Sequence, residues 1–306
     1  MARTITLGER EVTYGEGEYV TPLRDANDVV DDLDGLKQRL EEDGYLWIRG
    51  LHPRERVLDA RRTILEYVKE HGQAIDEESG DLMEAKVNSK LEKPGGQLPP
   101  LMGKKEITHN PAVRAVLEGE PVFDFFEGLF QEQARTFDYK WLRAVGPGGC
   151  TGAHYDFVYM GRGSGRLMTC WVPIGDISLD MGTLAICVGS HRDEKFKKLR
   201  ETYGQSDVDT DRHQGWFTKD PHEVSEMFGG RWAASPVEAG DVIVFGMHTM
   251  HMSTRNDSDR WRLSCDTRFQ PAADPVDERW AGENPTGHDG SGPVKTAEES
   301  RAEWNL

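Results

Sequence analysis

Leu167-Met-Thr-Cys-Trp-Val-Pro173 and Gly182-Thr-Leu-Ala-Ile-Cys-Val188 are the two runs that decide the fold of this chain. Both are short and mainly apolar, and a more polar segment that contains a glycine separates them. Short apolar runs bounded by turn residues are typical of strands buried in a sheet. We therefore predict two consecutive buried strands here.

The same pattern continues on both sides of these runs. We expect further strands at 137–145, 237–245 and 261–270, with short helical insertions at 193–203 and 222–228. Several short strands with regular turn signals indicate a barrel or sandwich of the jelly-roll kind. The fold class is therefore mainly β with flanking helices, and we place its β core at residues 136–270 of a single domain, 1–306.

The flanking segments differ in character from this core. Residues 1–135 are expected to be rich in helices, with helices at 29–42, 51–71, 111–118 and 122–131 and a strand at 45–49. Residues 72–106 are polar and contain several glycines, prolines and lysines, so they form either a lid over an active site or a solvated loop. We favour the lid. The tail, 271–306, is expected to be irregular.

Composition limits the classes of function. The net charge is −17, with 37% hydrophobic and 30% charged residues, so non-specific binding to nucleic acid or to an anionic membrane is disfavoured. No apolar run approaches membrane-spanning length, and the N-terminus lacks the apolar segment of a signal peptide. The four cysteines are scattered and form no CxxC pair, which argues against a zinc ribbon or a disulfide framework. We expect a cytoplasmic protein with reduced thiols.

The strongest chemical signal is His154-Tyr-Asp156, which follows a glycine-rich segment. On a strand, residues two apart share a face, so His154 and Asp156 can point at one ion. A distal histidine, His251, would complete a set of two imidazoles and one carboxylate. That set holds a divalent iron on one side and leaves the other positions open, as an oxygen-activating iron enzyme requires.

The sequence offers one alternative to the His-x-Asp motif and one alternative to the distal histidine. His-x-Asp is a weak motif by itself, and His191-Arg-Asp193 is a second copy. We interpret that copy as part of a loop near the rim of the site, because it follows Gly-Ser and precedes a charged stretch. His248 competes with His251 for the distal position. We choose His251 because a hairpin beyond it would return the next strand across the mouth of the barrel.

Arg262 on that next strand is a candidate anion-binding residue. By period two, Arg262, Ser264, Asp266 and Arg268 share one face, and one face of the strand must line the interior. A buried guanidinium is costly without an anionic partner, and a dicarboxylate co-substrate would supply one. The alternative is that these arginines simply solvate the edge of a sheet.

These residues together resemble a known family. The segments that carry the resemblance are His154-Tyr-Asp156, Met168-Thr-Cys-Trp171-Val-Pro-Ile-Gly-Asp, Gly182-Thr-Leu-Ala, Gly189-Ser-His191, Ala239-Gly-Asp-Val-Ile-Val-Phe245, His251-Met-Ser253 and Arg262-Leu-Ser. They are similar to the phytanoyl-CoA dioxygenase family of non-haem iron, 2-oxoglutarate-dependent oxygenases. The likeness covers roughly residues 140–270 and implies a double-stranded β-helix core of the cupin-like kind.

The resemblance also implies roles for single residues. His154, Asp156 and His251 would bind Fe(II). Arg262, helped by Ser253 and Thr169, would bind the distal carboxylate of 2-oxoglutarate, and Trp171 would border this co-substrate. Dioxygen is the second co-substrate. Where relatives usually have glycine after the distal histidine, this chain has Met252, a departure that concerns the local backbone rather than the ligands. Relatives that halogenate lack the carboxylate ligand, so the retained Asp156 favours hydroxylation.

The leading hypothesis is therefore a hydroxylase of a small-molecule substrate that releases succinate and carbon dioxide. Lys140, Arg143 and Tyr159 are possible residues of the substrate pocket, from the strand before the motif and the segment after it. The same iron chemistry can instead end in desaturation, cyclisation or epimerisation. A hypothesis of another class is a cupin-like metal protein that does not use 2-oxoglutarate. The sequence identifies neither the substrate nor the oligomeric state.

Overall fold

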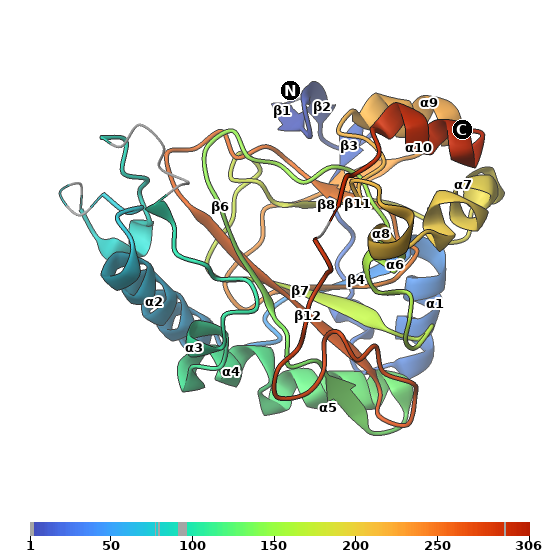
Figure 1. Ribbon diagram of the computed structural model, residues 1–306. Coiled ribbons are helices and arrows are strands. Elements are labelled where there is room, and N and C mark those ends of the chain that lie inside the picture. Colours follow the sequence, from blue (N-terminus) through green and yellow to red (C-terminus); the bar gives the residue numbers. More distant parts are fainter. Residues whose placement is uncertain (1–2, 77, 79, 91–96, 291) are drawn as a thin grey trace.

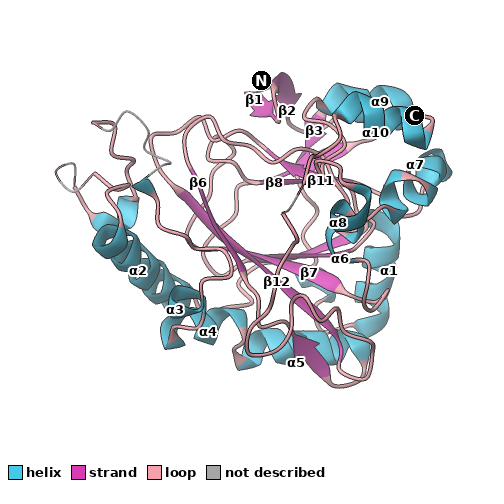
Figure 2. Ribbon diagram, in the orientation of Figure 1, coloured by secondary structure: helices cyan, strands magenta, loops and turns pink. Residues whose placement is uncertain are grey.

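The computed structural model describes residues 3–76, 78, 80–90, 97–290 and 292–306, and its strands form two sheets (Figures 1 and 2). The minor sheet has the order β1 (Arg3–Leu7), β2 (Arg10–Tyr14), β3 (Val20–Thr21), β9 (Trp232–Ala234), β8 (Leu184–Cys187) and β11 (His251–Ser253). The major sheet has the order β4 (Tyr45–Ile48), β10 (Val242–Gly246), β7 (Met168–Pro173), β12 (Arg262–Pro271) and β5 (Ala134–Thr136), with β6 (Trp141–Val145) also paired to β12.

Helices flank both sheets. Those before residue 135 are α1 (Leu33–Asp43), α2 (Arg54–His71), α3 (Lys105–Thr108), α4 (Pro111–Leu117) and α5 (Glu120–Phe130). Those after it are α6 (Phe157–Met160), α7 (Lys197–Glu201), α8 (Val208–Asp211), α9 (Pro221–Phe228) and α10 (Ala297–Trp304). Short 3-10 turns lie at Asn27–Val29, Leu82–Glu84, Glu194–Phe196 and Tyr203–Gln205. Among the helices described, none is both long and apolar enough to cross a membrane.

The strands in the middle of the major sheet, such as β7 and β10, are buried on both faces, and period two decides what each residue meets. In β10, Val242 and Val244 pack with residues of α1, α2, α4 and α5 in one apolar cluster. Ile243 and Phe245 point the other way, into a second cluster between the two sheets. Both faces of β10 meet apolar clusters, which is why this run shows no alternation of apolar and polar residues.

The space between the sheets is filled by large side chains from both of them. Trp47 and Trp171 of the major sheet meet Leu184 and Ile186 of the minor sheet, and all four are buried. Burial of each such side chain contributes about 1.5–3 kcal/mol to folding. Two facing sheets with an apolar filling and helices outside are the predicted double-stranded β-helix. The mainly β fold class with flanking helices is confirmed.

The β core begins earlier than we expected. We placed its start at residue 136, but β4 pairs with β10 in the major sheet, and β1 to β3 extend the minor sheet. We predicted a strand at 45–49 without assigning it to the core, and we missed β1 to β3. Both strands of the hairpin of β1 and β2 alternate polar and apolar residues around the Gly8-Glu9 turn, and Ile5, Leu7 and Val12 are buried, so the signal was present in the sequence.

The tail also differs in part from the prediction. It is largely irregular up to residue 296, but α10 then forms, near α9 at the C-terminus (Figure 1). Thr296 caps this helix by accepting from the Glu299 backbone N–H, and the Glu299 carboxylate accepts from the Thr296 N–H in return. Ser or Thr followed by Glu three residues later is the sequence signature of such a capping box. That signal was present, and we overlooked it.

The proposed lid, 72–106, is only partly described, since residues 77, 79 and 91–96 lie outside the described part of the chain. Its first half is attached to the hairpin before β12. Ala74 accepts a hydrogen bond of 2.8 Å from the Trp261 indole N–H, and Ala85 accepts one of 2.8 Å from the Trp261 backbone N–H. A segment held in this way is not a freely solvated loop, and closure over the site stays a prediction.

Candidate metal centre and co-substrate pocket

Main-chain pairing brings the two predicted histidine ligands together. Residues 153–154 lie beside β11 at the edge of the minor sheet. The His154 N–H donates to the His251 carbonyl at 2.9 Å, and the His251 N–H donates back at 3.1 Å. In such a pair the side chains leave the sheet on the same face. The ring centroids of the two imidazoles are accordingly 4.1 Å apart.

Asp156 completes the cluster from the residue that precedes α6. Its Oδ1 lies 3.6 Å from His154 Nε2 and 3.8 Å from His251 Nε2, and all three side chains are buried. Two atoms that bind one divalent ion through bonds of roughly 2.1 Å lie at most about 4.2 Å apart. These three residues can therefore hold one metal ion, and within the described residues they are the only cluster of this kind.

The tautomers of the imidazoles suit metal binding. His154 Nδ1 lies 2.8 Å from the Gly152 carbonyl oxygen, and His251 Nδ1 lies 2.9 Å from the Thr249 carbonyl oxygen. A carbonyl can only accept, so each Nδ1 carries the proton and each Nε2 keeps its lone pair for the cluster. Burial, with the neighbouring His154, also lowers the pKa of His251 to about 4. The neutral imidazole is the form that binds a metal.

The second oxygen of Asp156 is held on the opposite side from the imidazoles. Asp156 Oδ2 accepts from the Thr169 hydroxyl and lies 3.2 Å from Arg268 Nη2. Burial alone would raise the pKa of Asp156, but Arg268 and the two imidazoles hold it well below its usual value. The carboxylate is therefore ionised. We expected Thr169 at the co-substrate, whereas its hydroxyl contacts the metal-site carboxylate instead.

A pocket opens beside the imidazoles. It is lined by Arg143, Thr151, His154, Trp171, Leu184, His251, Met252, Ser253, Arg262 and Asp266. The inward face of β12 thus carries Arg262 and Asp266 into this pocket, as the period-two spacing predicted. The same face carries Arg268 to Asp156, a contact we did not predict although the sequence spacing allowed it.

Arg262 is a buried cation in need of an anion. It is 3% exposed, and its Nη1 donates to the Ser264 hydroxyl. Its Nε has no hydrogen-bond partner among the described residues. Burial lowers the pKa of Arg262 to about 10, so it stays charged at neutral pH. Asp266 attracts Arg262 but is already paired with Arg143 at 2.9 Å, so the buried Arg262 guanidinium is costly unless a further anion occupies the space beside it.

Two further residues that we expected at the co-substrate, Ser253 and Trp171, line the same pocket as Arg262. The Ser253 hydroxyl is buried in the pocket and accepts from the Thr151 backbone N–H at 2.8 Å. The Trp171 side chain lines the same pocket from β7. Met252 pairs with Ala185 in regular β geometry, so the departure from glycine leaves the local backbone undisturbed.

The three possible substrate-pocket residues have different surroundings. Arg143 lines the pocket and donates from Nε to Asp266 at 2.9 Å. Tyr159 packs edge-on against His154, with ring centroids 5.5 Å apart. Lys140 is not in the pocket, which corrects our expectation. Its side chain is fully buried, with Nζ 3.0 Å from Oε1 of Glu118 at the end of α4. The side chain leaves the backbone on the face that packs against the helices.

The competing histidines lie outside the metal cluster. His248 Nε2 is 3.0 Å from the Gly204 carbonyl oxygen, and its ring stacks on Phe157. His191 Nε2 is 3.1 Å from the Glu41 carbonyl oxygen near the end of α1. The selection of His251 and His154 over these two residues agrees with the geometry.

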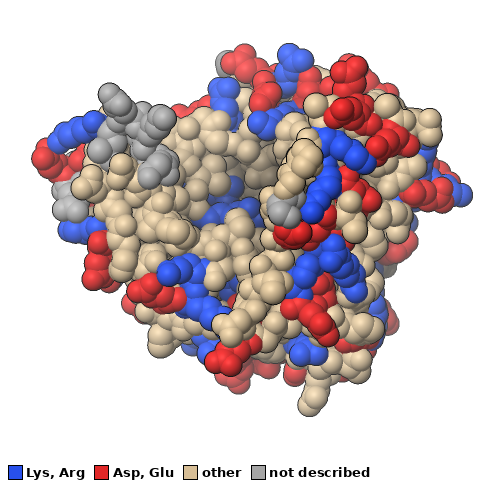
Figure 3. Space-filling model, viewed as in Figure 1, with Lys and Arg blue, Asp and Glu red and all other residues tan. Residues whose placement is uncertain are grey.

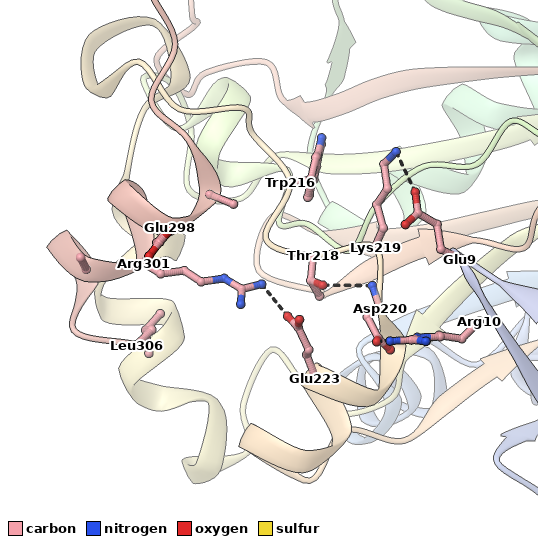
Figure 4. Close-up of a pocket in the computed structure, with 12 residues that line it drawn as sticks. Glu9, Arg10, Trp216, Thr218, Lys219, Asp220, Glu223, Glu298, Arg301 and Leu306 are labelled. Atoms are coloured by element: carbon pink, nitrogen blue, oxygen red, sulfur yellow. Dashed lines mark hydrogen bonds and ion pairs between the residues drawn. The ribbon is translucent and has the colours of Figure 1, made fainter.

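Figure 3 shows a recess near the middle of one face of the molecule, with basic side-chain atoms visible inside it. A larger pocket of about 900 Å³ lies elsewhere, between α10 and the turn of β1 and β2 (Figure 4). Its basic residues are paired with acidic neighbours, Lys219 with Glu9 and Arg301 with Glu223. None of the metal-cluster residues lines it, so we do not assign the chemistry to this pocket.

Comparison with known proteins agrees with this site. The family model of phytanoyl-CoA dioxygenase (PhyH) matches residues 40–264. A curated relative, 1-deoxypentalenic acid 11-beta-hydroxylase of Streptomyces exfoliatus, is 29% identical over 81% of this chain and 85% of its own length.

Solved structures share the fold. The epimerase SnoN, in complex with Fe³⁺, α-ketoglutarate and nogalamycin RO, is 19% identical with a TM-score of 0.56, over 87% of this chain and 96% of its own. Apo EctD from S. alaskensis is 15% identical with a TM-score of 0.57, over 94% of this chain and 91% of its own. With a matching family model over most of its length, a double-stranded β-helix and a buried His-Asp-His cluster, the chain belongs to the phytanoyl-CoA dioxygenase family.

Proposed function

We propose that this protein is an Fe(II)- and 2-oxoglutarate-dependent dioxygenase that hydroxylates an unactivated C–H bond of a small molecule. Family membership and a relative named as a hydroxylase support this class of reaction. The identity of the substrate is a separate matter, because a fold carries many different substrates.

His154, Asp156 and His251 would hold the Fe(II). Arg262 would bind the distal carboxylate of 2-oxoglutarate, with the Ser253 hydroxyl beside it, since a guanidinium suits the planar geometry of a carboxylate. When bound, the iron would activate dioxygen, which is the oxidant; one oxygen atom would go to the substrate and the other to 2-oxoglutarate, which would leave as succinate and carbon dioxide. The protein binds and orients the reactants and keeps the site dry.

The observation that carries this proposal is the buried Arg262. An isolated metal protein needs only the His-Asp-His cluster. The additional guanidinium, charged, buried and with an unpartnered Nε, is explained by an acidic co-substrate next to the metal. This feature argues against the cupin-like metal protein that uses no 2-oxoglutarate.

Epimerisation, desaturation and cyclisation are the second candidate outcomes. SnoN is described as an epimerase and has a similar fold, but at 19% identity the likeness extends to the fold alone. The relative named as a hydroxylase is nearer in sequence, at 29% identity. Hydroxylation is therefore the outcome we favour.

The test is turnover of 2-oxoglutarate. Purified protein with Fe(II), ascorbate and dioxygen is given a panel of small molecules, 1-deoxypentalenic acid among them, and succinate is measured with and without each compound. We expect succinate from the wild type, and much less from Arg262→Ala and His154→Ala. If the wild type forms no succinate and does not bind 2-oxoglutarate by calorimetry, the proposal fails.

A further inference from the structure

We propose that Thr169 and Arg268 form a clamp on the outer oxygen of Asp156, which restricts this carboxylate to a single coordinating oxygen. The clamp would keep open a metal position that the co-substrates need. This inference rests on the proposed function, since it concerns how the metal site is kept ready for 2-oxoglutarate and dioxygen.

The contacts of Asp156 divide cleanly between its two oxygens. Oδ1 faces both imidazoles, at 3.6 and 3.8 Å from their Nε2 atoms. Oδ2 accepts from the Thr169 hydroxyl and lies 3.2 Å from Arg268 Nη2. All of these side chains are buried, so water does not compete for the same lone pairs.

The clamp is built into the register of the major sheet. Thr169 of β7 and Arg268 of β12 are direct cross-strand partners. Cross-strand partners project from the same face of a sheet, so both donors reach the carboxylate from neighbouring positions. No loop movement is required to bring the two donors together.

Arg268 is also fixed along its length. Its Nε lies 3.1 Å from the Met160 sulfur, and its guanidinium lies over the Trp141 ring at 4.6 Å. Trp141 in turn packs on Trp280 of the C-terminal tail, with ring centroids 4.9 Å apart. An arginine held on three sides can position a carboxylate, which a mobile one cannot.

The chemistry explains why the position of Oδ2 matters. A carboxylate can bind a metal through one oxygen or through both. The two-histidine, one-carboxylate set is useful because one face of the ion stays open. Under the proposed function the keto acid and dioxygen would need these open positions, so a chelating Asp156 would compete with a co-substrate. Two donors on Oδ2 oppose that chelation.

Two substitutions isolate the clamp, and each has a conservative control. Thr169→Val removes the hydroxyl with little change in volume, and Thr169→Ser restores it. Arg268→Met removes the charge and keeps much of the length, and Arg268→Lys keeps the charge. If the double variant Thr169→Val/Arg268→Met does not fold, Thr169→Val compared with Thr169→Ser still carries the test. Unfolding temperatures of the metal-free proteins show whether each variant is folded.

The readouts are measured on anaerobic Co(II)- or Fe(II)-loaded protein. Crystal structures give the distance from the metal to Oδ2, and calorimetry gives the affinity for the metal and then for 2-oxoglutarate. Loss of a contact that orients a metal ligand typically costs about 10- to 100-fold in affinity or activity. We expect Oδ2 to move into bonding distance of the metal in Thr169→Val, with 2-oxoglutarate affinity at least about tenfold lower. Thr169→Ser should restore both.

One-oxygen coordination and wild-type 2-oxoglutarate affinity in Thr169→Val and in the folded double variant would overturn the clamp. A wild type that binds neither metal nor 2-oxoglutarate would instead overturn the proposed function. The two failures are therefore distinguishable, because the first is seen only in the variants and the second already in the wild type.

Discussion

His154 and His251 are bonded to each other twice through their backbones, by N–H···O=C hydrogen bonds of 2.9 and 3.1 Å. Their side chains therefore start from adjacent points of the same sheet. The distance between the two imidazoles is set by main-chain pairing rather than by side-chain packing. This pairing joins the loop after β6 to β11, residues that are far apart in the sequence.

The first prediction separates the two candidate distal ligands. His251→Ala removes one of the three metal-binding side chains and should abolish detectable Fe(II) binding and succinate formation. His248→Ala is the matched control, because His248 bonds to the Gly204 carbonyl outside the cluster. It should keep metal affinity within about threefold of the wild type, since a lost neutral hydrogen bond costs only about 0.5–1.5 kcal/mol of stability. Equal losses in the two variants would show that the cluster is assigned wrongly.

The second prediction concerns the buried arginine. Arg262→Gln should weaken 2-oxoglutarate binding about 10- to 100-fold, because hydrogen bonds to charged groups contribute about 1.5–3 kcal/mol. Metal affinity should stay nearly unchanged. The control is Arg260→Gln, two residues away, whose side chain is 41% exposed and pairs with Glu84 at 3.8 Å. Calorimetry on metal-loaded protein measures both, and an undiminished affinity in Arg262→Gln would refute the assigned role.

The third prediction follows from the corrected position of Lys140. Glu118→Gln removes the carboxylate that neutralises this fully buried lysine, so the free energy of unfolding should fall by about 3 kcal/mol. Arg114→Gln breaks a pair with the same glutamate, but the Arg114 side chain is half exposed, so it should cost less than about 1 kcal/mol. Denaturant titration compares the variants. A smaller effect for Glu118→Gln than for Arg114→Gln would contradict the buried pair.

The fourth prediction concerns acid stability. Burial lowers the pKa of His52 to about 4, and neither ring nitrogen has a partner among the described residues. The unfolded chain takes up this proton near pH 6.5 and the folded chain only near pH 4, so stability falls as the pH drops through that window. At pH 4 this difference in proton binding lowers the free energy of unfolding by up to about 3 kcal/mol relative to neutral pH. In His52→Phe the dependence should be flatter between pH 7 and pH 4, measured by denaturant titration. Identical slopes in both proteins would show that His52 is not buried in its neutral form.

The core strands were predictable because their sequences record burial directly. The apolar run that ends at Phe245 and the run that ends at Pro173 became β10 and β7, within a few residues of the expected ends. The hairpin of β1 and β2 was predictable too, because polar and apolar residues alternate in both strands on either side of the Gly8-Glu9 turn, but we missed that alternation.

Residue types and spacing also indicated the three candidate metal ligands that the structure brings together, but not the contacts behind them. The period-two face of β12 indicated that Arg262 and Arg268 point the same way. It did not show that Arg268 would meet Asp156, because that contact depends on how the chain turns at Asp156 to enter α6. Likewise, Lys140 lies just before β6, and only the packing of α4 and α5 beneath the sheet decides which face it joins.

The most direct test of the central claim is an anaerobic titration of the purified protein with Fe(II) and then with 2-oxoglutarate. The visible charge-transfer absorption of the iron–keto acid chelate is recorded at each addition. The account predicts this absorption at one equivalent of each in the wild type, its absence in His154→Ala, and a weaker 2-oxoglutarate response in Arg262→Gln. A wild type that shows no such absorption and no metal binding, or an unchanged spectrum in His154→Ala, would contradict the account.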